Sequence, residues 1–373
     1  MKRLLIVLFA LGLVLAACDS SDSDDTTTTT AAEGGTEETT ETTAAPAASG
    51  SLLQTVKDRG TLNCGVNDAI PGFGFTDADG NFSGFDIDYC KAVAAAVLGD
   101  PDAVTYRPLT AQQRFTALQS GEIDVLIRNT TFTSSRDGRE GATFLTTTFY
   151  DGQGMMVRAD SGITSIDEMA NLSVCVLTGT TTELNLATRF GDTPFTPLTF
   201  DANDQILAAF TAGQCDGWTS DKSQLAGVRS NFPDAEGGPE ALVILDETFS
   251  KEPLGPVVVD GDSQWAQVVD WVVLATIQAE EFGLTSANVA EYDGDDAAIR
   301  RFLGLEVETD EGTTVFDPGL GLATDYAATV IAAVGNYGEI FDRNVGPNTA
   351  LGLSRGFNAQ WTDGGLLYAP PYR

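Results

Sequence analysis

Two arginines and several hydroxyl side chains stand close together in the first half of the chain. Arg128, Asn129 and Thr131 directly follow an apolar run typical of a strand, and Arg136 comes after three hydroxyl residues. A guanidinium offers a planar fork for both oxygens of a carboxylate, and hydroxyl and amide groups add further donors. The pattern therefore indicates a carboxylate site at a strand end. A Ser/Thr helix cap beside two solvated arginines is the alternative, and spacing alone leaves both open.

A second anion site and a cation site follow further along the chain. Gly179, Thr180 and Thr181 come just after another expected strand and open an expected helix, whose free N–H groups would hold an anion. Asp221 lies just past a third strand, where its carboxylate could accept hydrogen bonds from an ammonium group. A plain helix cap and an exposed carboxylate are the respective alternatives. Together these segments supply donors for a carboxylate and an acceptor for an ammonium, each at a strand end.

The overall composition excludes several kinds of chemistry. The chain has no histidine, and its 20 basic and 54 acidic residues give a net charge of −34. Histidine is the commonest general base and the commonest metal ligand, so we expect neither a Ser-His or Cys-His catalytic pair nor a metal site, and no cofactor. A strongly acidic protein repels phosphates, so nucleic acid and anionic lipid are not expected partners.

Short strands alternate with helices in two similar series. The first series has strands at 61–66, 104–107 and 123–127 and helices at 85–98 and 111–119; the second has strands at 173–177, 195–200 and 215–219 and helices at 182–190 and 204–212. Strand–helix–strand alternation is typical of α/β proteins with a mainly parallel sheet flanked by helices. Two such series predict two lobes. A further helix is expected at 263–282.

Two extended passages separate these series and could form a two-strand hinge. Residues 149–154 contain two glycines, and 253–259 contain two prolines. If the chain crosses between lobes at both, the first lobe comprises 51–152 and 255–373, with a helical C-terminal extension, and the second comprises 153–254. A plain loop is the alternative for the first passage. Ligands of open α/β sheets lie at the carboxyl ends of the strands, so the cleft between the lobes is the expected site.

Four cysteines lie within this part of the chain: Cys64, Cys90, Cys175 and Cys215. An even number without a CxxC pair favours disulfides over metal binding in an exported protein. Spacing suggests Cys64 with Cys90 and Cys175 with Cys215. Four inert buried thiols are the alternative.

The first residues have the layout of an export signal. Lys2 and Arg3 precede an apolar run of about a dozen residues, too short for a membrane span that needs about 20, and small residues lead up to Cys18. We expect residues 1–17 to be a signal peptide and Cys18 to carry a lipid, in the manner of a bacterial lipobox. Cleavage beside an incidental cysteine is the alternative. Residues 18–50 are acidic and threonine-rich, so we expect a disordered tether that leaves the protein on the outer face of the cell membrane.

Many short motifs in the same order give the chain a specific resemblance. From about Leu52 to Arg373 it resembles the extracellular solute-binding proteins (family 3) of general and polar L-amino acid ABC transporters, with the periplasmic-binding-protein fold of type II. The resemblance rests on residues 64–67, 84–88, 114–118, 128–131, 148–154, 179–183, 251–256, 335–339 and 364–371.

The resemblance implies roles for individual residues. The carboxylate-binding arginine falls on Arg136, with help from Asn129, Thr131 and the amide of Thr181, and the ammonium-binding aspartate falls on Asp221. The loop after the first strand, with Asn67, Ile70 and Phe73, contacts the ligand side chain in such proteins. Binders of basic amino acids carry an aspartate and an aromatic at positions of that loop where this chain has Asn67 and Ile70, so the resemblance does not imply an exclusive preference for Lys or Arg. Arg128 replaces a small serine of those relatives and favours Glu, Asp, Gln or Asn.

The function implied is capture of a free L-amino acid by lobe closure and its delivery to the transmembrane permease of an ABC transporter. No bond in the ligand changes, so no residue is expected to be catalytic. The resemblance also implies a monomer. A dehydratase acting on arogenate or prephenate is the alternative on this fold, and it would need Asp221 or Glu183 as its acid. A receptor sensor domain is a third reading, which the absence of a following membrane helix makes weak.

Overall fold

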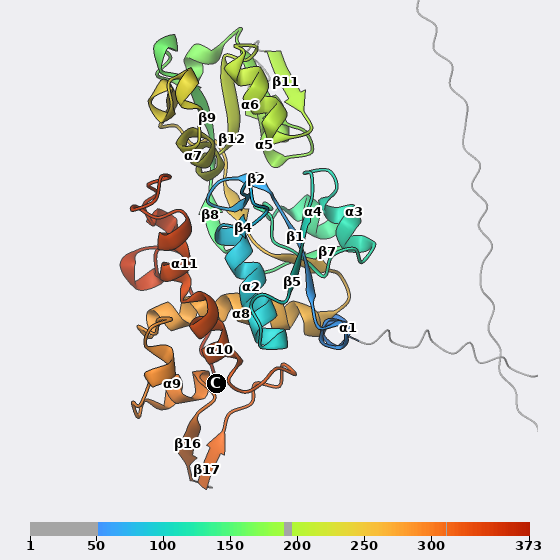
Figure 1. Ribbon diagram of the computed structural model, residues 1–373, viewed down its shortest axis with the longest axis vertical. Helices are drawn as coiled ribbons and strands as arrows, with labels where there is room; N and C mark the ends of the chain where they lie inside the picture. The colour runs from blue at the N-terminus through green and yellow to red at the C-terminus, as the bar shows by residue number, and fades with distance from the viewer. Residues whose placement is uncertain (1–50, 190–195, 311) are drawn as a thin grey trace, which may run out of the picture. The chain divides into compact units, whose positions relative to one another are not determined.

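The computed structural model describes residues 51–189, 196–310 and 312–373, and these contain two five-stranded sheets. The predicted signal peptide, Cys18 and the tether lie outside the described residues. The first sheet has the order β5 (Val104–Pro108), β1 (Leu62–Val66), β6 (Val125–Leu126), β15 (Val257–Val259), β7 (Ala142–Phe144). The second has the order β11 (Thr196–Phe200), β10 (Ser173–Leu177), β12 (Gly217–Asp221), β9 (Gln153–Arg158), β13 (Leu242–Ile244). The α/β architecture is as predicted (Figure 1).

One strand in each sheet runs against the other four. In the first sheet β15 pairs antiparallel with both β6 and β7, and in the second β9 pairs antiparallel with both β12 and β13. The remaining pairs, β1 with β5 and β6 and β10 with β11 and β12, are parallel. These two antiparallel strands, β9 and β15, are each the first strand that the chain forms after it crosses from one sheet to the other. The chain therefore enters each sheet from the opposite end at that point.

Helices accompany both sheets. Those of the first are α1 (Leu52–Arg59), α2 (Phe85–Leu98), α3 (Arg114–Gln119), α4 (Ser134–Arg139) and α8 (Ser263–Glu281); those of the second are α5 (Thr181–Arg189), α6 (Asn203–Thr211) and α7 (Lys222–Ser230). α2 begins and ends at the predicted residues, because Gly99 in the left-handed conformation stops it. α3 begins three residues later than predicted, because the Gln113 side chain accepts from the Thr110 N–H and holds a turn there.

The chain after α8 forms a further group of helices and a hairpin on the side of the first sheet. It forms α9 (Ala297–Phe302), a hairpin of β16 (Glu306–Thr309) and β17 (Gly312–Val315), α10 (Tyr326–Val334) and α11 (Tyr337–Asn344). A small sheet of β2 (Ala69–Ile70), β3 (Gly74–Thr76) and β4 (Phe82–Ser83) follows β1. Single 3-10 turns occur at 159–161, 166–169, 234–236, 239–241, 289–291, 356–358 and 361–363.

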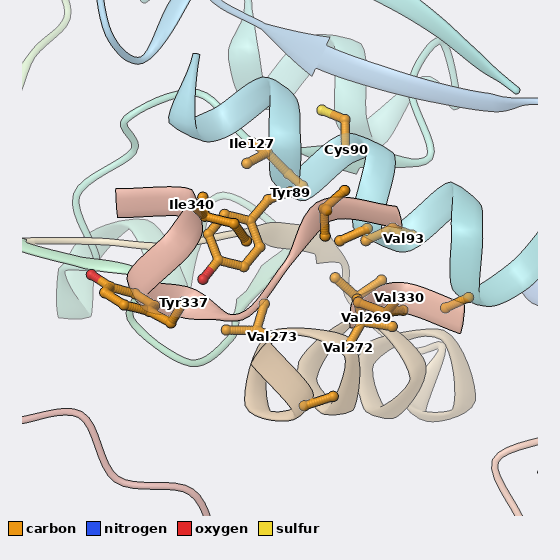
Figure 2. Packing of buried hydrophobic residues seen from close by; sticks show 14 of the residues in the cluster. Tyr89, Cys90, Val93, Ile127, Val269, Val272, Val273, Val330, Tyr337 and Ile340 are labelled. Carbon is orange, nitrogen blue, oxygen red and sulfur yellow. The ribbon is translucent and has the colours of Figure 1, made fainter. Parts of the chain in front are cut away.

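The main core forms where α2, α8, α10 and α11 meet. Val93 of α2, Val269 and Val272 of α8 and Val330 of α10 are fully buried and face one another (Figure 2). Tyr337 at the start of α11 lies in the same core, and its hydroxyl donates to the Thr148 carbonyl at 2.8 Å. The C-terminal elements thus pack as part of the first lobe.

Two short strands carry the chain between the sheets. β8 (Phe149–Asp151) pairs antiparallel with β14 (Glu252–Leu254), and Asp151 lies opposite Glu252. Asn358 binds the other edge of β8, since its side chain accepts from Tyr150 N at 2.7 Å and donates to Tyr150 O at 3.1 Å. We call the β8–β14 pair the hinge ribbon. The lobe boundaries at 152/153 and 254/255 stay a prediction.

Each lobe contains one disulfide. Cys64 bonds Cys90, and Cys175 bonds Cys215, the pairings that spacing suggested. The first ties β1 to α2, and the second ties β10 to the segment two residues before β12. No helix within the described part of the chain is both long and apolar enough to cross a membrane.

Candidate ligand-binding site

The ends of β6, β10 and β12 meet around a small cavity between the two sheets. It is lined by Arg114, Arg128, Asn129, Thr131, Arg136, Leu177, Thr180, Thr181, Thr182, Ser220, Asp221 and Gln224. The structure therefore brings together seven of the ten predicted ligand-binding residues. The cavity measures about 20 Å³, close to what one water molecule needs. Its residues come from both lobes and nearly fill it.

Three guanidinium groups give this cavity a positive side. Arg114 and Arg128 are buried and Arg136 is half-buried. Burial lowers the pKa of Arg128 to about 10. Burial and the neighbouring Arg136 and Arg128 hold the pKa of Arg114 well below its ordinary value. Such a concentration of cations is costly without an anion, so the arrangement suits a carboxylate.

Arg136 is positioned by the turn that precedes it. Thr133 caps α4 by accepting from the Arg136 N–H at 3.2 Å. The alternative of a Ser/Thr helix cap is therefore correct as far as the cap itself is concerned. The guanidinium does not point to solvent, however. Its Nη1 donates to the Thr131 carbonyl at 2.9 Å, and the group lies over the Phe115 ring. The Ser/Thr cluster therefore caps a helix and also directs Arg136 to the cavity.

Asp221 forms the negative side of the cavity. It is the last residue of β12, two residues later than the strand predicted at 215–219, and is 5% exposed. Its Oδ1 has no hydrogen-bond partner among the described residues. Burial, and then repulsion from Asp151 and Glu252, raises its pKa well above the ordinary value. A buried acceptor without a donor is what an ammonium group would satisfy.

Asn129 is held in an unusual backbone conformation beside the cavity. Its φ of 29° lies in the left-handed region, which asparagine tolerates better than most residues. Its N–H donates to Asp86 Oδ2 at 2.8 Å, and its Nδ2 reaches Gln224 Oε1 of the other lobe at 3.4 Å. Its Oδ1 has no partner within the described residues.

The start of α5 brings a second group of donors. Thr180 Oγ1 accepts from the Glu183 N–H at 3.1 Å, and the Glu183 carboxylate accepts from the Gly179 N–H at 2.8 Å, so both take part in capping. Thr181 Oγ1 donates to Glu252 Oε2 of the hinge ribbon at 2.7 Å and lies 3.3 Å from Thr131 Oγ1 of the first lobe. The Thr181 side chain therefore connects the cavity to the hinge ribbon.

A larger cavity of about 390 Å³ adjoins the small one and shares Arg128 and Leu177 with it. It is also lined by Asn67, Asp68, Ala69, Pro108, Leu109, Thr110, Gln113, Asp201, Ala202, Asn203 and Asp204. Its size is within the usual range of small-molecule sites, roughly 300–1,000 Å³.

Two predicted residues of the loop after β1 lie elsewhere. Ile70 and Phe73 line neither cavity and are 1% exposed in the core, where the Phe73 ring meets those of Phe85 and Phe149. Of that loop, Asn67 does line the larger cavity. A ligand contact by Ile70 or Phe73 stays a prediction without support from these cavities.

The sequence interpretation missed the residues that follow β5 and β11. Thr110 lies two residues after β5 and Asn203 three residues after β11, and both line the larger cavity. The rule that ligands bind at carboxyl ends of strands would have found them, had it been applied to all six parallel strands. Arg114 was also missed, because an arginine in a helix normally faces solvent.

The chain is similar to known proteins over most of its length. Residues 62–313 match the bacterial extracellular solute-binding proteins, family 3. The general L-amino acid-binding periplasmic protein AapJ of Rhizobium johnstonii is 50% identical over 330 residues, 88% of this chain and 94% of that protein. The glutamate/glutamine/aspartate/asparagine-binding protein BztA of Rhodobacter capsulatus is 49% identical over 331 residues, 88% of this chain and 95% of that protein.

A solved structure agrees with the same assignment. An ABC transporter/periplasmic binding protein from Brucella ovis with glutathione bound superposes with a TM-score of 0.81 at 47% identity, covering 87% of this chain and 99% of that one. The predicted type II periplasmic-binding-protein fold is thereby confirmed, and so is the expectation of a transporter binding protein rather than an enzyme. The chain belongs to family 3 of the bacterial extracellular solute-binding proteins.

Proposed function

We propose that this protein captures free L-amino acids with polar or acidic side chains and binds several of them. The observation that supports this most directly is that Asp221 Oδ1, which has no partner in the described part of the chain, and the guanidinium of Arg136 line the same small cavity. An α-amino acid carries the ammonium and carboxylate that such a pair would satisfy. Arg128, also at the cavity, would bind a side-chain carboxylate or amide oxygen. The names of AapJ and BztA, a general binder and a Glu/Gln/Asp/Asn binder, agree with this range.

The ligand enters when the lobes separate and is held when they close. A cavity of about 20 Å³ is too small for an amino acid, so the two lobes must part before one can bind. A ligand that bridges donors of both lobes then shifts the population toward a closed state. We propose that the permease of an ABC transporter receives the closed form from a monomer. Ligands larger than one amino acid also occur among relatives, since the Brucella ovis protein holds glutathione.

Calorimetric titration with the twenty amino acids tests the proposal. We expect heat from glutamate, glutamine, aspartate or asparagine, and silence across the panel would contradict it. Arg136→Ala or Asp221→Ala should weaken binding by at least about 100-fold, because each leaves one ligand charge buried without a partner. Asp160→Asn, an exposed aspartate of the same lobe as Asp221, is the matched control and should bind as the original protein does.

We further propose that a lipid on Cys18 holds the protein on the outer face of the cell membrane. The support is the sequence alone: a short apolar run that ends in small residues before a cysteine. Cys18→Ser should release the protein into the medium, as measured by immunoblotting of cell and medium fractions. A variant that remains with the membrane would contradict the anchor.

A further inference from the structure

The larger cavity continues from the place where a ligand side chain would end. Arg128 lines both cavities, and only its Nε has a hydrogen-bond partner in the described part of the chain, the Leu109 carbonyl at 2.8 Å. Its two terminal nitrogens stay available at the junction. In the proposed function these nitrogens bind the side-chain carboxylate or amide of the amino acid, so anything attached to that group would extend into the larger cavity.

The small cavity determines where such an extension can be attached. Arg136 and Asp221 would bind the α-carboxylate and the α-ammonium, so neither group is available for a peptide bond. A ligand longer than one amino acid must therefore grow from its side chain. For glutamate this means an amide formed at the γ-carboxyl group, whose carbonyl oxygen still accepts a hydrogen bond from Arg128.

One residue that lines the larger cavity has an unpaired hydrogen-bond donor within the described part of the chain. Asn67 lines it and is 2% exposed, and its Nδ2 has no hydrogen-bond partner among the described residues. Buried amide donors are nearly always paired in native proteins. Asn67 is therefore a polar lining residue whose amide the described protein leaves unsatisfied.

The rim of the larger cavity is acidic. Asp68, Asp201 and Asp204 line it and are exposed, whereas Arg128 is the only basic residue among the described residues that line it and is buried at the inner end. The potential therefore changes from positive at the junction to negative at the rim. An extension that ends in a carboxylate is repelled there, and one that ends in an amide or an amine is not.

We propose that the larger cavity is a second subsite, which takes the extension of a γ-linked glutamyl compound and prefers an extension ending in amide or amine to one ending in carboxylate. This inference rests on the proposed function, because it places the glutamyl head group in the small cavity. It identifies a ligand class by its point of attachment and by the charge at its far end.

Titration with a matched pair of ligands tests the inference. γ-Glutamylglycine and γ-glutamylglycine amide differ only in the charge of the far end. We expect both to bind, and the amide to bind about 3- to 10-fold more tightly at low ionic strength, since several exposed carboxylates each contribute modestly. The preference should shrink in high salt.

Two double variants locate the effect. Asp68→Asn with Asp201→Asn removes two charges at the rim and should reduce the preference for the amide. Asp160→Asn with Asp167→Asn removes two exposed charges that line neither cavity and should leave the preference intact. The ligand comparison in the unaltered protein stands even if a variant fails to fold.

The outcomes separate this inference from the proposed function. If glutamate binds but neither γ-glutamyl compound does, or if both bind equally at low ionic strength, the second subsite is wrong and the proposed function stands. If no amino acid binds either, the proposed function fails and this inference fails with it. A preference for the amide that is reduced by Asp68→Asn with Asp201→Asn, but not by Asp160→Asn with Asp167→Asn, would support the inference.

Discussion

Two buried carboxylates near the small cavity, Asp86 and Asp221, differ in their partners. Asp86 accepts from the Asn129 N–H at 2.8 Å and thereby fixes the left-handed backbone of that residue. Asp221 has an oxygen without a partner in the described residues. The first carboxylate therefore stabilises the geometry of the site, whereas the second is available to a ligand. Protonation of Asp221 should therefore affect ligand binding, and protonation of Asp86 should affect the stability of the protein.

Binding should release a proton from Asp221. Burial, with Asp151 and Glu252 nearby, raises the pKa of Asp221 well above 3.8 in the protein without ligand. An ammonium group needs the ionised carboxylate, so the ligand lowers this pKa and displaces a proton. Affinity should therefore fall as the pH falls through the raised pKa. Titration calorimetry in buffers of different ionisation enthalpy measures the proton, and a binding heat independent of the buffer would contradict the expectation.

Asp86 should make the stability of the ligand-free protein depend on pH in the opposite sense to the affinity: stability should fall as the pH rises. Burial raises the pKa of Asp86 to about 7 from 3.8. Between these values the folded protein binds a proton that the unfolded chain does not, so the free energy of unfolding falls as the pH rises from about 4 to about 7. The loss should be of the order of 2–4 kcal/mol. Asp86→Asn should flatten this part of a plot of Tm against pH, and Asp79→Asn, an exposed control, should not.

At the scale of elements, the hinge ribbon is braced by the C-terminal part of the chain. Asn358 binds both backbone groups of Tyr150, as a neighbouring strand would. Arg355 supports it by donating from Nε to the Asn358 carbonyl at 2.8 Å, and Arg355 itself forms two 2.9 Å bonds with Glu280 of α8. This chain of contacts connects β8 to the core of the first lobe and restricts how the ribbon can bend.

Asn358→Ala should therefore loosen the ribbon. It leaves the half-buried N–H and C=O groups of Tyr150 without these partners, at a cost of about 1–3 kcal/mol in the free energy of unfolding. We also expect a change in the affinity for glutamate, because the balance between open and closed lobes changes. Asn358→Asp keeps the acceptor and loses the donor. Its free energy of unfolding, measured by urea denaturation, should therefore lie between those of Asn358→Ala and the original protein. Equal stability of Asn358→Ala and the original protein would contradict this role.

The elements differ in how well the sequence predicts them. The ends of α2, β10 and α8 agree with prediction within a residue. For the region after α8 the sequence predicts a helical extension without helix bounds, because its short helices depend on packing against α2 and α8 for their stability. Arg114 escaped notice for a similar reason. Its side chain is buried by contacts with Thr130 and with Gly179 of the other lobe, which no local pattern in the sequence contains.

At the scale of the whole molecule, the proposed capture of an amino acid requires movement of the lobes. Direct contacts join them near the small cavity, including Thr131 with Thr181 at 3.3 Å and Arg114 Nη2 with the Gly179 carbonyl at 3.3 Å. The structure therefore has its lobes in contact, with room for about one water molecule between the charged groups.

A reversible crosslink between the lobes tests this requirement. In the double variant Thr131→Cys with Thr181→Cys, a disulfide would keep the lobes together. We expect the oxidised protein to give no binding heat with glutamate and the protein treated with a mild reductant to regain it. The two single variants under the same conditions control for loss of the hydroxyl groups. Undiminished binding by the oxidised double variant would show that a ligand enters without separation of the lobes.

The hinge ribbon also constrains how the ligand preference of this protein can change. Glu252 of β14 accepts from Thr181 and from Asn185, and Asp151 of β8 accepts from the Ser223 N–H in the first turn of α7. Both carboxylates also act on the charge of Asp221. A substitution that adapts the cavity to a new ligand charge therefore changes the mechanics of the strands that must bend. Selection for a new nutrient, in nature or in the laboratory, would have to adjust recognition and motion together.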